Sequence, residues 1–246
     1  MRQLNVYMLP ELAHPHKLAG KTVVVVDILR ATTTIATALD HGAVAVLPCL
    51  EVDEARNLAQ QHRESLTRTL LAGERKGLPI KGFDLGNSPA EYGREAVEGC
   101  LIVFTTTNGT KAMRRAVGAG RLLTGAFANL SATWDAVADD SDIEIICAGT
   151  DGAVTREDVL FAGAFAERAV LASSQCELND QASIALDAWR SLRNDGDDLA
   201  ASLRETQGGR NLMAIGHEHD ISTAAKIDTI GMASELDLAT WQIKVR

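Results

Sequence analysis

The first strong pattern in the chain is a run of four valines at residues 23–26, with no polar residue between them. A strand with one face in water alternates apolar and polar residues, whereas a strand buried on both faces reads as a continuous β-branched run. We therefore predict a core strand over residues 21–27. Because this strand ends in Asp27, it delivers a carboxylate to the edge of its sheet.

Further apolar runs of strand length alternate with segments of helical spacing. The predicted strands comprise residues 4–9, 43–50, 69–72, 101–104, 121–125 and 143–147. The predicted helices comprise residues 34–39, 52–62, 129–138 and 159–171, and another that contains Ala112, Met113 and Val117. Pro48 indicates that its end of the strand lies at an edge or a bulge, because proline donates no ladder hydrogen bond. Repeated strand–helix units predict an α/β fold built on a layered sheet.

The pattern changes beyond Ser173 to amphipathic helices, predicted at residues 180–193 and 199–205. We expect no strand in this part of the chain before residues 241–245. No linker is evident, so residues 1–246 are predicted to form a single domain. The helical C-terminal part, residues 174–240, is a candidate subregion within it.

A short motif in the C-terminal part, His217-Glu218-His219-Asp220, contains residue types that bind metals. Adjacent side chains diverge on a helix or strand, and nothing nearby completes a zinc pattern. We therefore interpret the motif as a surface turn.

Polar residues gather where the predicted core strand leaves the sheet. Asp27 is followed by Arg30 and by three threonines, among them Thr32 and Thr33, in the turn that starts the next helix. Ligands of open α/β sheets bind at this edge, where helix N-termini and loop amides converge. The combination suggests a metal and an oxyanion held side by side, although helix capping explains any one of these residues equally well.

The strand at residues 101–104 ends in a second polar stretch, Thr105-Thr106-Thr107-Asn108-Gly109-Thr110-Lys111. Hydroxyl groups, backbone amides and a lysine at the start of a helix suit an anion. The alternative is a threonine-rich strand edge followed by an Asn-Gly turn, which is a common sequence.

Acidic residues follow two other predicted strands. Glu157 and Asp158 open the helix after the strand at residues 143–147, where the helix dipole alone would favour them. Glu74 and Asp84 lie in the segment 73–87, which we predict to be a loop. A loop of this length indicates function or disorder, and its apolar residues favour order.

The end of that loop carries a helix-start signal. Ser88 can act as N-cap, Pro89 fits the first helical position and Glu91 can complete a capping box. We therefore assign Ser88 a mainly structural role.

Composition restricts the class of protein. The 246 residues are 46% hydrophobic and carry a net charge of −9. This charge disfavours nucleic-acid binding, which depends on clustered Lys and Arg. No basic segment leads into an apolar stretch near the start, and no apolar run approaches the roughly 20 residues of a membrane span, so we expect a cytoplasmic protein without a membrane partner. The cysteines form no Cys-x-x-Cys pair, which favours reduced, structural thiols, Cys147 included.

The strand ends together offer hard oxygen ligands and cations. The acidic candidates are Asp27, Glu74 or Asp84, and Glu157 or Asp158; the cations are Arg30, Arg75 and Lys111. Magnesium takes few carboxylates and completes its shell with water and phosphate oxygens. We therefore expect metal-assisted phosphoryl chemistry, with the cations neutralising the anion. The Gly-x-Gly-x-x-Gly, P-loop and Gly-x-Ser-x-Gly motifs do not appear.

These polar segments fall within longer blocks between residues 23 and 163. The blocks are Val-Val-Asp-Ile-Leu-Arg-Ala-Thr-Thr-Thr (25–34), Ala-Gly-Glu-Arg (72–75), Gly-Phe-Asp-Leu-Gly-Asn-Ser-Pro (82–89), Thr-Thr-Asn-Gly-Thr (106–110) and Cys-Ala-Gly-Thr (147–150). Their order and spacing resemble the 2-phosphosulfolactate phosphatase family. Glu157-Asp158, followed by Ala162-Gly163, looks like the late acidic motif of that family.

The resemblance implies a magnesium-dependent acid phosphatase. Such an enzyme releases phosphate from 2-phospho-3-sulfolactate, a small anionic phosphorylated substrate, and leaves 3-sulfolactate. In archaeal members this step belongs to coenzyme M biosynthesis. The resemblance also implies a three-layer α/β/α fold with a mostly parallel or mixed central sheet, and it covers the chain after Ser173 only weakly.

From the residues and the resemblance we expect Asp27 to bind Mg²⁺ with Glu74 and with Glu157 or Asp158. The residues expected to act in catalysis are Asp27, Arg30 and Asn108. The residues expected to bind substrate are Thr32, Thr33, Thr106, Thr107, Gly109, Lys111 and Arg75, the last opposite the sulfonate. Haloacid-dehalogenase phosphatases carry a second aspartate where this chain has Leu29. We therefore favour direct attack by water over an aspartyl-phosphate on Asp27.

The sequence is also compatible with two other functions. The chain could hydrolyse a related phosphorylated hydroxy acid, because selection of the sulfonate can depend on one cation. It could also be an anion-binding protein that keeps the same residues without turnover. The oligomeric state is open as well, and apolar surfaces on the C-terminal helices would suit a homodimer.

Overall fold

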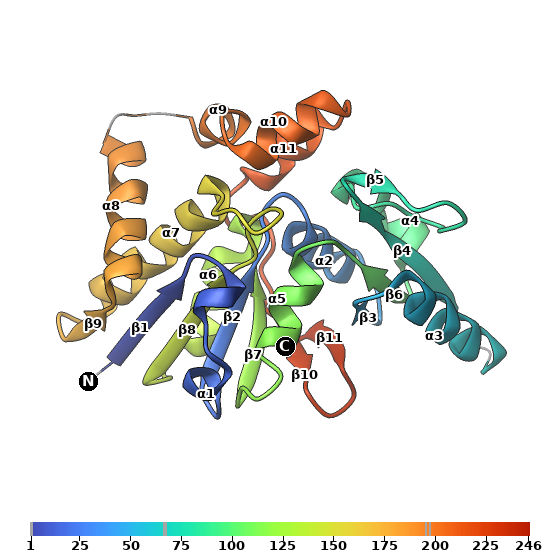
Figure 1. Ribbon diagram of the computed structural model, residues 1–246, viewed down its shortest axis with the longest axis horizontal. Coiled ribbons are helices and arrows are strands. Elements are labelled where there is room, and N and C mark those ends of the chain that lie inside the picture. The colour runs from blue at the N-terminus through green and yellow to red at the C-terminus, as the bar shows by residue number, and fades with distance from the viewer. Residues whose placement is uncertain (1, 66–67, 195, 197) are drawn as a thin grey trace.

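The computed structural model describes residues 2–65, 68–194, 196 and 198–246. It is an α/β structure in which one large mixed sheet lies between helices, as a three-layer α/β/α fold requires (Figure 1). The order across the sheet is β5-β4-β6-β3-β11-β10-β7-β2-β8-β1-β9. The strands are β1 Arg2–Tyr7, β2 Thr22–Val26, β3 Ala45–Cys49, β4 Thr69–Arg75, β5 Leu78–Pro79, β6 Leu101–Thr105, β7 Arg121–Gly125, β8 Asp142–Cys147, β9 Cys176–Leu178, β10 Ser234–Asp237 and β11 Gln242–Val245.

The helices connect and cover these strands. The α-helices are α1 Pro15–Leu18, α2 Ala31–Asp40, α3 Val52–Glu64, α4 Arg94–Val97, α5 Gly109–Arg115, α6 Leu130–Val137, α7 Arg156–Ala172, α8 Asp180–Asn194, α9 Leu199–Arg204, α10 Gln207–Ala214 and α11 Glu218–Ala224. Three short 3₁₀ helices are η1 Pro10–Leu12, η2 Pro89–Glu91 and η3 Phe127–Asn129. In the part of the chain described, no helix is long and apolar enough to cross a membrane.

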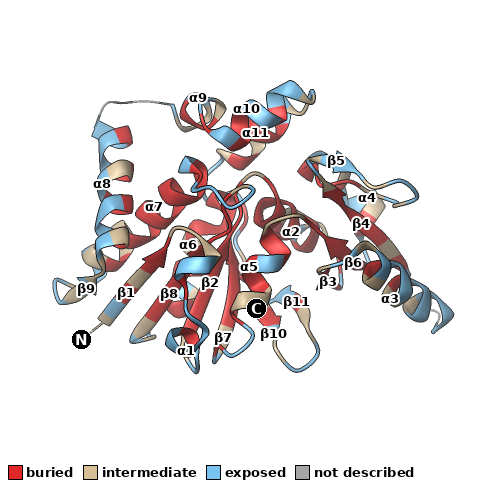
Figure 2. Cartoon of the chain, in the orientation of Figure 1, coloured by how far each residue is buried: buried red, intermediate tan, exposed pale blue. Residues whose placement is uncertain are grey.

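The valine run forms β2 and is buried along its whole length, as predicted. Val24 and Val26 belong to the core cluster that contains Phe161 of α7. Val23 and Val25 face the opposite way, into a second cluster with Ile35 of α2. The alternation of side chains along one strand thus joins two cores, which explains why the run contains no polar residue. Figure 2 shows the central strands almost entirely buried.

The sheet consists of two parallel blocks joined by an antiparallel hairpin. Strands β4, β6 and β3 form one block, and β7, β2, β8, β1 and β9 form the other. The hairpin of β10 and β11 lies between them, with β10 antiparallel to β7 and β11 antiparallel to β3. The sequence left open a mostly parallel or a mixed sheet. The sheet is mixed because β10 and β11 run antiparallel to their neighbours and β5 runs antiparallel to β4.

Several predicted elements need correction. The C-terminal part was expected to lack strands before residues 241–245, but it contains the short strands β9 and β10, which carry few apolar residues. The predicted loop at 73–87 begins with the end of β4, which pairs with β5 in a hairpin. The turn of this hairpin is Lys76-Gly77, and both residues have positive φ, as a two-residue hairpin turn requires.

Two smaller expectations concern Pro48 and Val117. Pro48 lies in an interior strand and pairs with Phe104 of β6, but among the described residues β3 pairs with β11 only at Val46. The Pro48 end of this strand therefore has one unpaired side, as expected for a proline. Val117 was expected in the helix but lies beyond the end of α5 and is exposed. The predicted start at Ser88 is confirmed, since Glu91 accepts a hydrogen bond from the Ser88 backbone N–H at 3.3 Å.

The position of the hairpin generates a stability prediction. Ile243 of β11 is fully buried and lies where the two blocks join. Ile243→Ala should lower the free energy of unfolding by about 2–5 kcal/mol, because it removes buried apolar atoms and leaves a cavity. Urea unfolding at constant m-value measures this change. Ile184→Ala is the matched control, since Ile184 is 57% exposed; equal losses in the two variants would contradict the central role of the hairpin.

Candidate active site

A pocket of about 400 Å³ lies where loops from both blocks meet the C-terminal helices. The β2–α2 turn contributes Asp27, Leu29 and Arg30, and the β4–β5 hairpin contributes Glu74, Lys76 and Gly77. Asn87, Thr107, Asn108, Thr150 and Asp151 line it from the loops before η2, α5 and α7. Gly208, Asn211, Leu212, Ala214 and Ile215 complete it from the α10 region. Segments far apart in sequence therefore share one cavity.

Asp27 is held at the end of β2 by the turn that follows it. Its Oδ1 accepts a hydrogen bond from the Ala31 N–H at 3.2 Å. The Thr32 hydroxyl bonds both the N–H and the carbonyl of Asp27, and the Thr33 hydroxyl donates to the Ile28 carbonyl. Both threonines are buried and stabilise the turn, which is the capping role left open by the sequence.

Burial raises the pKa of Asp27 from 3.8 to about 7. The hydrogen bond from Ala31 opposes this shift, the nearby charges of Glu74 and Glu157 add to it, and Arg30 opposes it. Burial also raises the pKa of Glu157, and it raises that of Asp158 well above the usual range, with Asp27 contributing. Removing carboxylates from water disfavours their charged form, so this cluster favours a proton or a cation.

Asp158 ties two strands together. Its Oδ1 accepts from the Ile28 N–H at 2.8 Å and its Oδ2 from the Gly149 N–H at 3.0 Å. These amides follow β2 and β8, so the carboxylate fixes the relative positions of both strand ends. Glu74 acts similarly, because its two oxygens accept from the N–H groups of Thr107 and Gly77, each at 2.7 Å.

Several buried oxygen atoms near the pocket lack hydrogen-bond partners among the described residues. They are Glu157 Oε2, Asn87 Oδ1 and Thr107 Oγ1. Two glycines allow the carboxylates to approach the backbone closely: a Cβ on Gly109 would lie 2.8 Å from Asp27 Oδ2, and one on Gly208 would overlap Glu157 Oε1. Buried oxygens without a hydrogen-bond partner are suitable ligands for a hard cation. The residues therefore fit Mg²⁺, with Asp27 and Glu157 as the carboxylates best placed to bind it.

The four predicted metal ligands do not form one tight group. Within the described ranges, the only three His, Cys, Asp or Glu side chains with donor atoms mutually within 4.8 Å are His217, His219 and Asp220. This is compatible with Mg²⁺, which needs only one or two carboxylates. Asp84, the alternative to Glu74, lies outside the pocket lining, and its Oδ2 accepts from Arg63 and from the Leu71 N–H.

The pocket lining contains two cations, Arg30 and Lys76. Arg30 is 3% exposed, whereas Lys76 is exposed in the hairpin turn. Arg75 does not line the pocket; its guanidinium donates to the carbonyls of Glu74 and Leu50 and to the Thr105 hydroxyl. Lys111 lies on the exposed side of α5. Lys76, the residue after Arg75, therefore borders the cavity in its place.

The polar stretch before α5 divides between two roles. Thr107 and Asn108 line the pocket, and Asn108 Oδ1 accepts from the Asp151 N–H at 3.4 Å, which links two loops. Thr106 instead stabilises the start of α5, where its hydroxyl and carbonyl both accept hydrogen bonds from Thr110. Gly109 permits the close approach of Asp27 described above.

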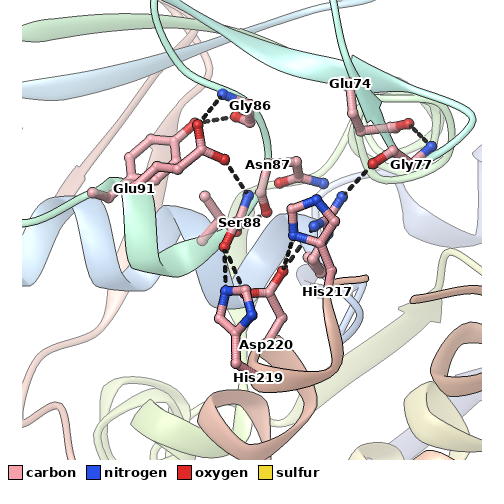
Figure 3. Close-up of polar contacts among 12 residues, drawn as sticks. Glu74, Gly77, Gly86, Asn87, Ser88, Glu91, His217, His219 and Asp220 are labelled. Carbon is pink, nitrogen blue, oxygen red and sulfur yellow. Dashed lines mark hydrogen bonds and ion pairs between the residues drawn. The ribbon is translucent and has the colours of Figure 1, made fainter. Parts of the chain in front are cut away.

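The interpretation of His217-Glu218-His219-Asp220 as a surface turn was wrong, because Glu218, His219 and Asp220 form the start of α11. Asp220 is 1% exposed in α11, and its Oδ2 accepts from Arg30 Nη1 at 2.7 Å. The Ser88 hydroxyl donates to the other oxygen, Oδ1, at 2.6 Å (Figure 3). The residue types at 217–220 were a visible signal. Their partner was not, because Arg30 lies 190 positions earlier.

Comparison with known proteins gives a consistent result. Residues 7–237 match the family described as 2-phosphosulpholactate phosphatase. A protein of Symbiobacterium thermophilum named "Probable 2-phosphosulfolactate phosphatase" is 41% identical over 215 residues, which cover 87% of this chain and 90% of the relative. Proteins with the same name from Deinococcus radiodurans and Prochlorococcus marinus are 40% and 39% identical, cover 92% and 89% of this chain, and are each covered over 90% of their length.

The raised pKa of Asp27 generates a pH prediction for the metal-free protein. Its folded-state pKa of about 7 exceeds the ordinary 3.8, so the folded state binds the proton more tightly than the unfolded state. The stabilisation from this protonation is complete below about pH 4 and is lost as pH rises through 7, by up to about 4 kcal/mol. In Asp27→Asn this loss should disappear.

Urea unfolding between pH 4 and 8 in the presence of a chelator measures the difference between wild type and Asp27→Asn. Asp53→Asn, on the exposed surface of α3, is the matched carboxylate-to-amide control and should follow the wild type. A wild-type curve parallel to that of Asp27→Asn across this range would contradict the assignment.

Proposed function

The chain belongs to the 2-phosphosulfolactate phosphatase family, and from this premise we propose that it is a phosphoric monoester hydrolase that converts 2-phospho-3-sulfolactate to 3-sulfolactate and phosphate. The observation that carries the proposal is the pocket in which Asp27 lies with Arg30 and Lys76. This pocket offers acidic, cationic and amide groups at one sheet edge, and phosphoryl transfer depends on groups of these kinds.

The charge of the pocket supports a metal ion as cofactor. Its lining carries three acidic side chains, Asp27, Glu74 and Asp151, against the two cations. A substrate with phosphate, sulfonate and carboxylate groups is strongly anionic and would be repelled by this balance. We propose Mg²⁺ as the missing cation, held by Asp27 and by Glu157, whose Oε2 is buried without a partner among the described residues. When bound, the ion supplies charge neutralisation and polarises the phosphoryl group.

Side chains of the pocket would bind the charged groups of the substrate. Arg30 and the lining residues Thr107 and Asn108 would hold the phosphoryl oxygens, and Lys76 would face the sulfonate or the carboxylate. Water would attack phosphorus directly: a new P–O bond forms, the bond from phosphorus to the C2 oxygen breaks, and that oxygen takes a proton. Leu29 lines the pocket where a second aspartate would be needed for an aspartyl-phosphate, which supports this route.

The proposal also concerns the cellular compartment in which the protein acts. Cys49, Cys100, Cys147 and Cys176 are all free. Burial raises the pKa of Cys147 well above its usual range, so this thiol is unreactive. Free thiols are typical of a reducing compartment, and we therefore propose a cytoplasmic enzyme.

The first test is phosphate release from 2-phospho-3-sulfolactate, with and without Mg²⁺. We expect magnesium-dependent turnover that falls at least about 100-fold in Asp27→Asn, because the variant loses the carboxylate that holds the ion. Asp53→Asn should keep wild-type turnover. Silence of the wild type on a panel of small phosphomonoesters would favour an anion-binding protein, and phosphate trapped covalently on Asp27 would contradict direct hydrolysis.

The second test concerns Lys76. Lys76→Met keeps most of the side-chain length but removes the charge, so KM for 2-phospho-3-sulfolactate should rise by about 10-fold. KM for 2-phospholactate, which lacks the sulfonate, should change less. Lys81→Met is the control, since Lys81 is exposed on the same segment outside the pocket lining. Equal effects of Lys76→Met on both substrates would remove the sulfonate contact and leave only a general anion contact.

A further inference from the structure

Asp220 is a charged residue that has no role in the proposed mechanism, yet it makes polar contacts with several side chains. It lies in α11, at the side of the pocket formed by the C-terminal helices, and is almost fully buried. Its ion pair with Arg30 joins two side chains that are 1% and 3% exposed. Burial of both charges has a desolvation cost, and removal of either partner would leave the other buried and unpaired.

We propose that Asp220 is a positioning residue, which orients the Arg30 guanidinium toward the phosphoryl oxygens of the substrate. This inference rests on the proposed function and adds a carboxylate from the C-terminal part of the chain to the active site. Asp220 acts through Arg30 and does not itself contact the substrate.

The hydrogen bonds of Arg30 support this role. Nη1 donates to Asp220 Oδ2 at 2.7 Å and Nη2 donates to the Gly77 carbonyl at 2.8 Å. A guanidinium is planar and has five N–H groups in a rigid fork, so two fixed donors set the direction of the others. Because Arg30 also lines the pocket, the N–H groups outside these two bonds are available to an anion there.

Asp220 is itself held in place by other groups. The Ser88 hydroxyl donates to Oδ1, and His219 Nε2 lies 3.0 Å from the same oxygen. His217 Nδ1 lies 3.4 Å from Oδ2 but makes no hydrogen bond among the described residues. Ser88 is anchored through its backbone N–H to Glu91. A series of contacts therefore leads from Glu91 through Ser88 to Asp220 (Figure 3), and from Asp220 to Arg30.

Metal binding by His217, His219 and Asp220 is the competing interpretation of this cluster. Both oxygens of Asp220 already accept short hydrogen bonds, and one of them is 2.7 Å from a guanidinium nitrogen. A metal ion bound to that carboxylate would lie against the positive charge of Arg30, which opposes its binding. The cluster therefore supports an arginine better than a metal.

A double-mutant cycle tests the proposal. The variants are Asp220→Asn, Arg30→Gln and the double variant, and the readouts are kcat and KM for phosphate release and the Kd of inorganic phosphate by calorimetry. We expect Asp220→Asn to raise KM and the phosphate Kd by about 10- to 100-fold, as loss of partners that orient binding groups does elsewhere. In the Arg30→Gln background, Asp220→Asn should add less than about twofold, because its only route of action is gone.

The control is Glu218→Gln on the same helix. Glu218 pairs with Arg204 on the surface, with 60% of its side chain exposed, and its variant should bind phosphate like the wild type. An unchanged phosphate Kd in a folded Asp220→Asn variant would overturn the proposal. So would effects of Asp220→Asn and Arg30→Gln that multiply in the double variant, since that is the behaviour of two independent groups.

A second variant covers loss of folding in Asp220→Asn. Ser88→Ala removes only the hydroxyl that holds Asp220 Oδ1, and it should raise the phosphate Kd by about 3- to 10-fold in wild type and leave it unchanged in Arg30→Gln. An unchanged Kd in Ser88→Ala would then overturn the proposal. If the wild type hydrolyses no phosphate ester, the proposed function fails, whereas the phosphate Kd values still decide the role of Asp220.

Discussion

The burial of carboxyl groups at one edge of the sheet is the constraint on which the rest of this site depends. Asp27, Glu157 and Asp158 all have raised pKa values because water is excluded from them. Asp158 offsets the cost of its burial by accepting hydrogen bonds from two backbone N–H groups, so its role is structural. Asp27 accepts a backbone hydrogen bond on Oδ1, from Ala31, and Glu157 Oε2 has no partner among the described residues. Gly109 and Gly208, which lack a Cβ, allow these two carboxylates to lie against the backbone.

The two blocks of the sheet explain how so many loops reach one pocket. Asp27 follows β2 in one block, whereas Glu74 and Thr107 come from β4 and β6 in the other. The carboxyl ends of both sets of strands therefore meet around the cavity, with α10 and α11 beside them (Figure 1). Glu74 accepts hydrogen bonds from Thr107 and Gly77, and it thereby fixes the relative positions of the loops after β4 and β6.

What the sequence predicted, and what it did not, follows the range of the interactions. The valine run and Asp27 could be predicted because burial on both faces leaves a local signature. Arg75 was predicted to bind substrate, but Lys76 borders the pocket instead, because the end of β4 and the turn after it decide which side chain lies there. Asp220 was misinterpreted because its meaning depends on Arg30, a partner from a distant segment. The strands β9 and β10 were missed because the sheet, and not their composition, makes them strands.

The central hairpin has a consequence for how the protein is made. Strands β10 and β11 follow all other strands in sequence, yet they occupy the middle of the sheet. During synthesis the two parallel blocks can each form local structure, but the edges of β7 and β3 stay unpaired until the hairpin has left the ribosome. Until that moment the nascent chain carries two open sheet edges, and chaperone binding and aggregation compete there with the pairing of the hairpin.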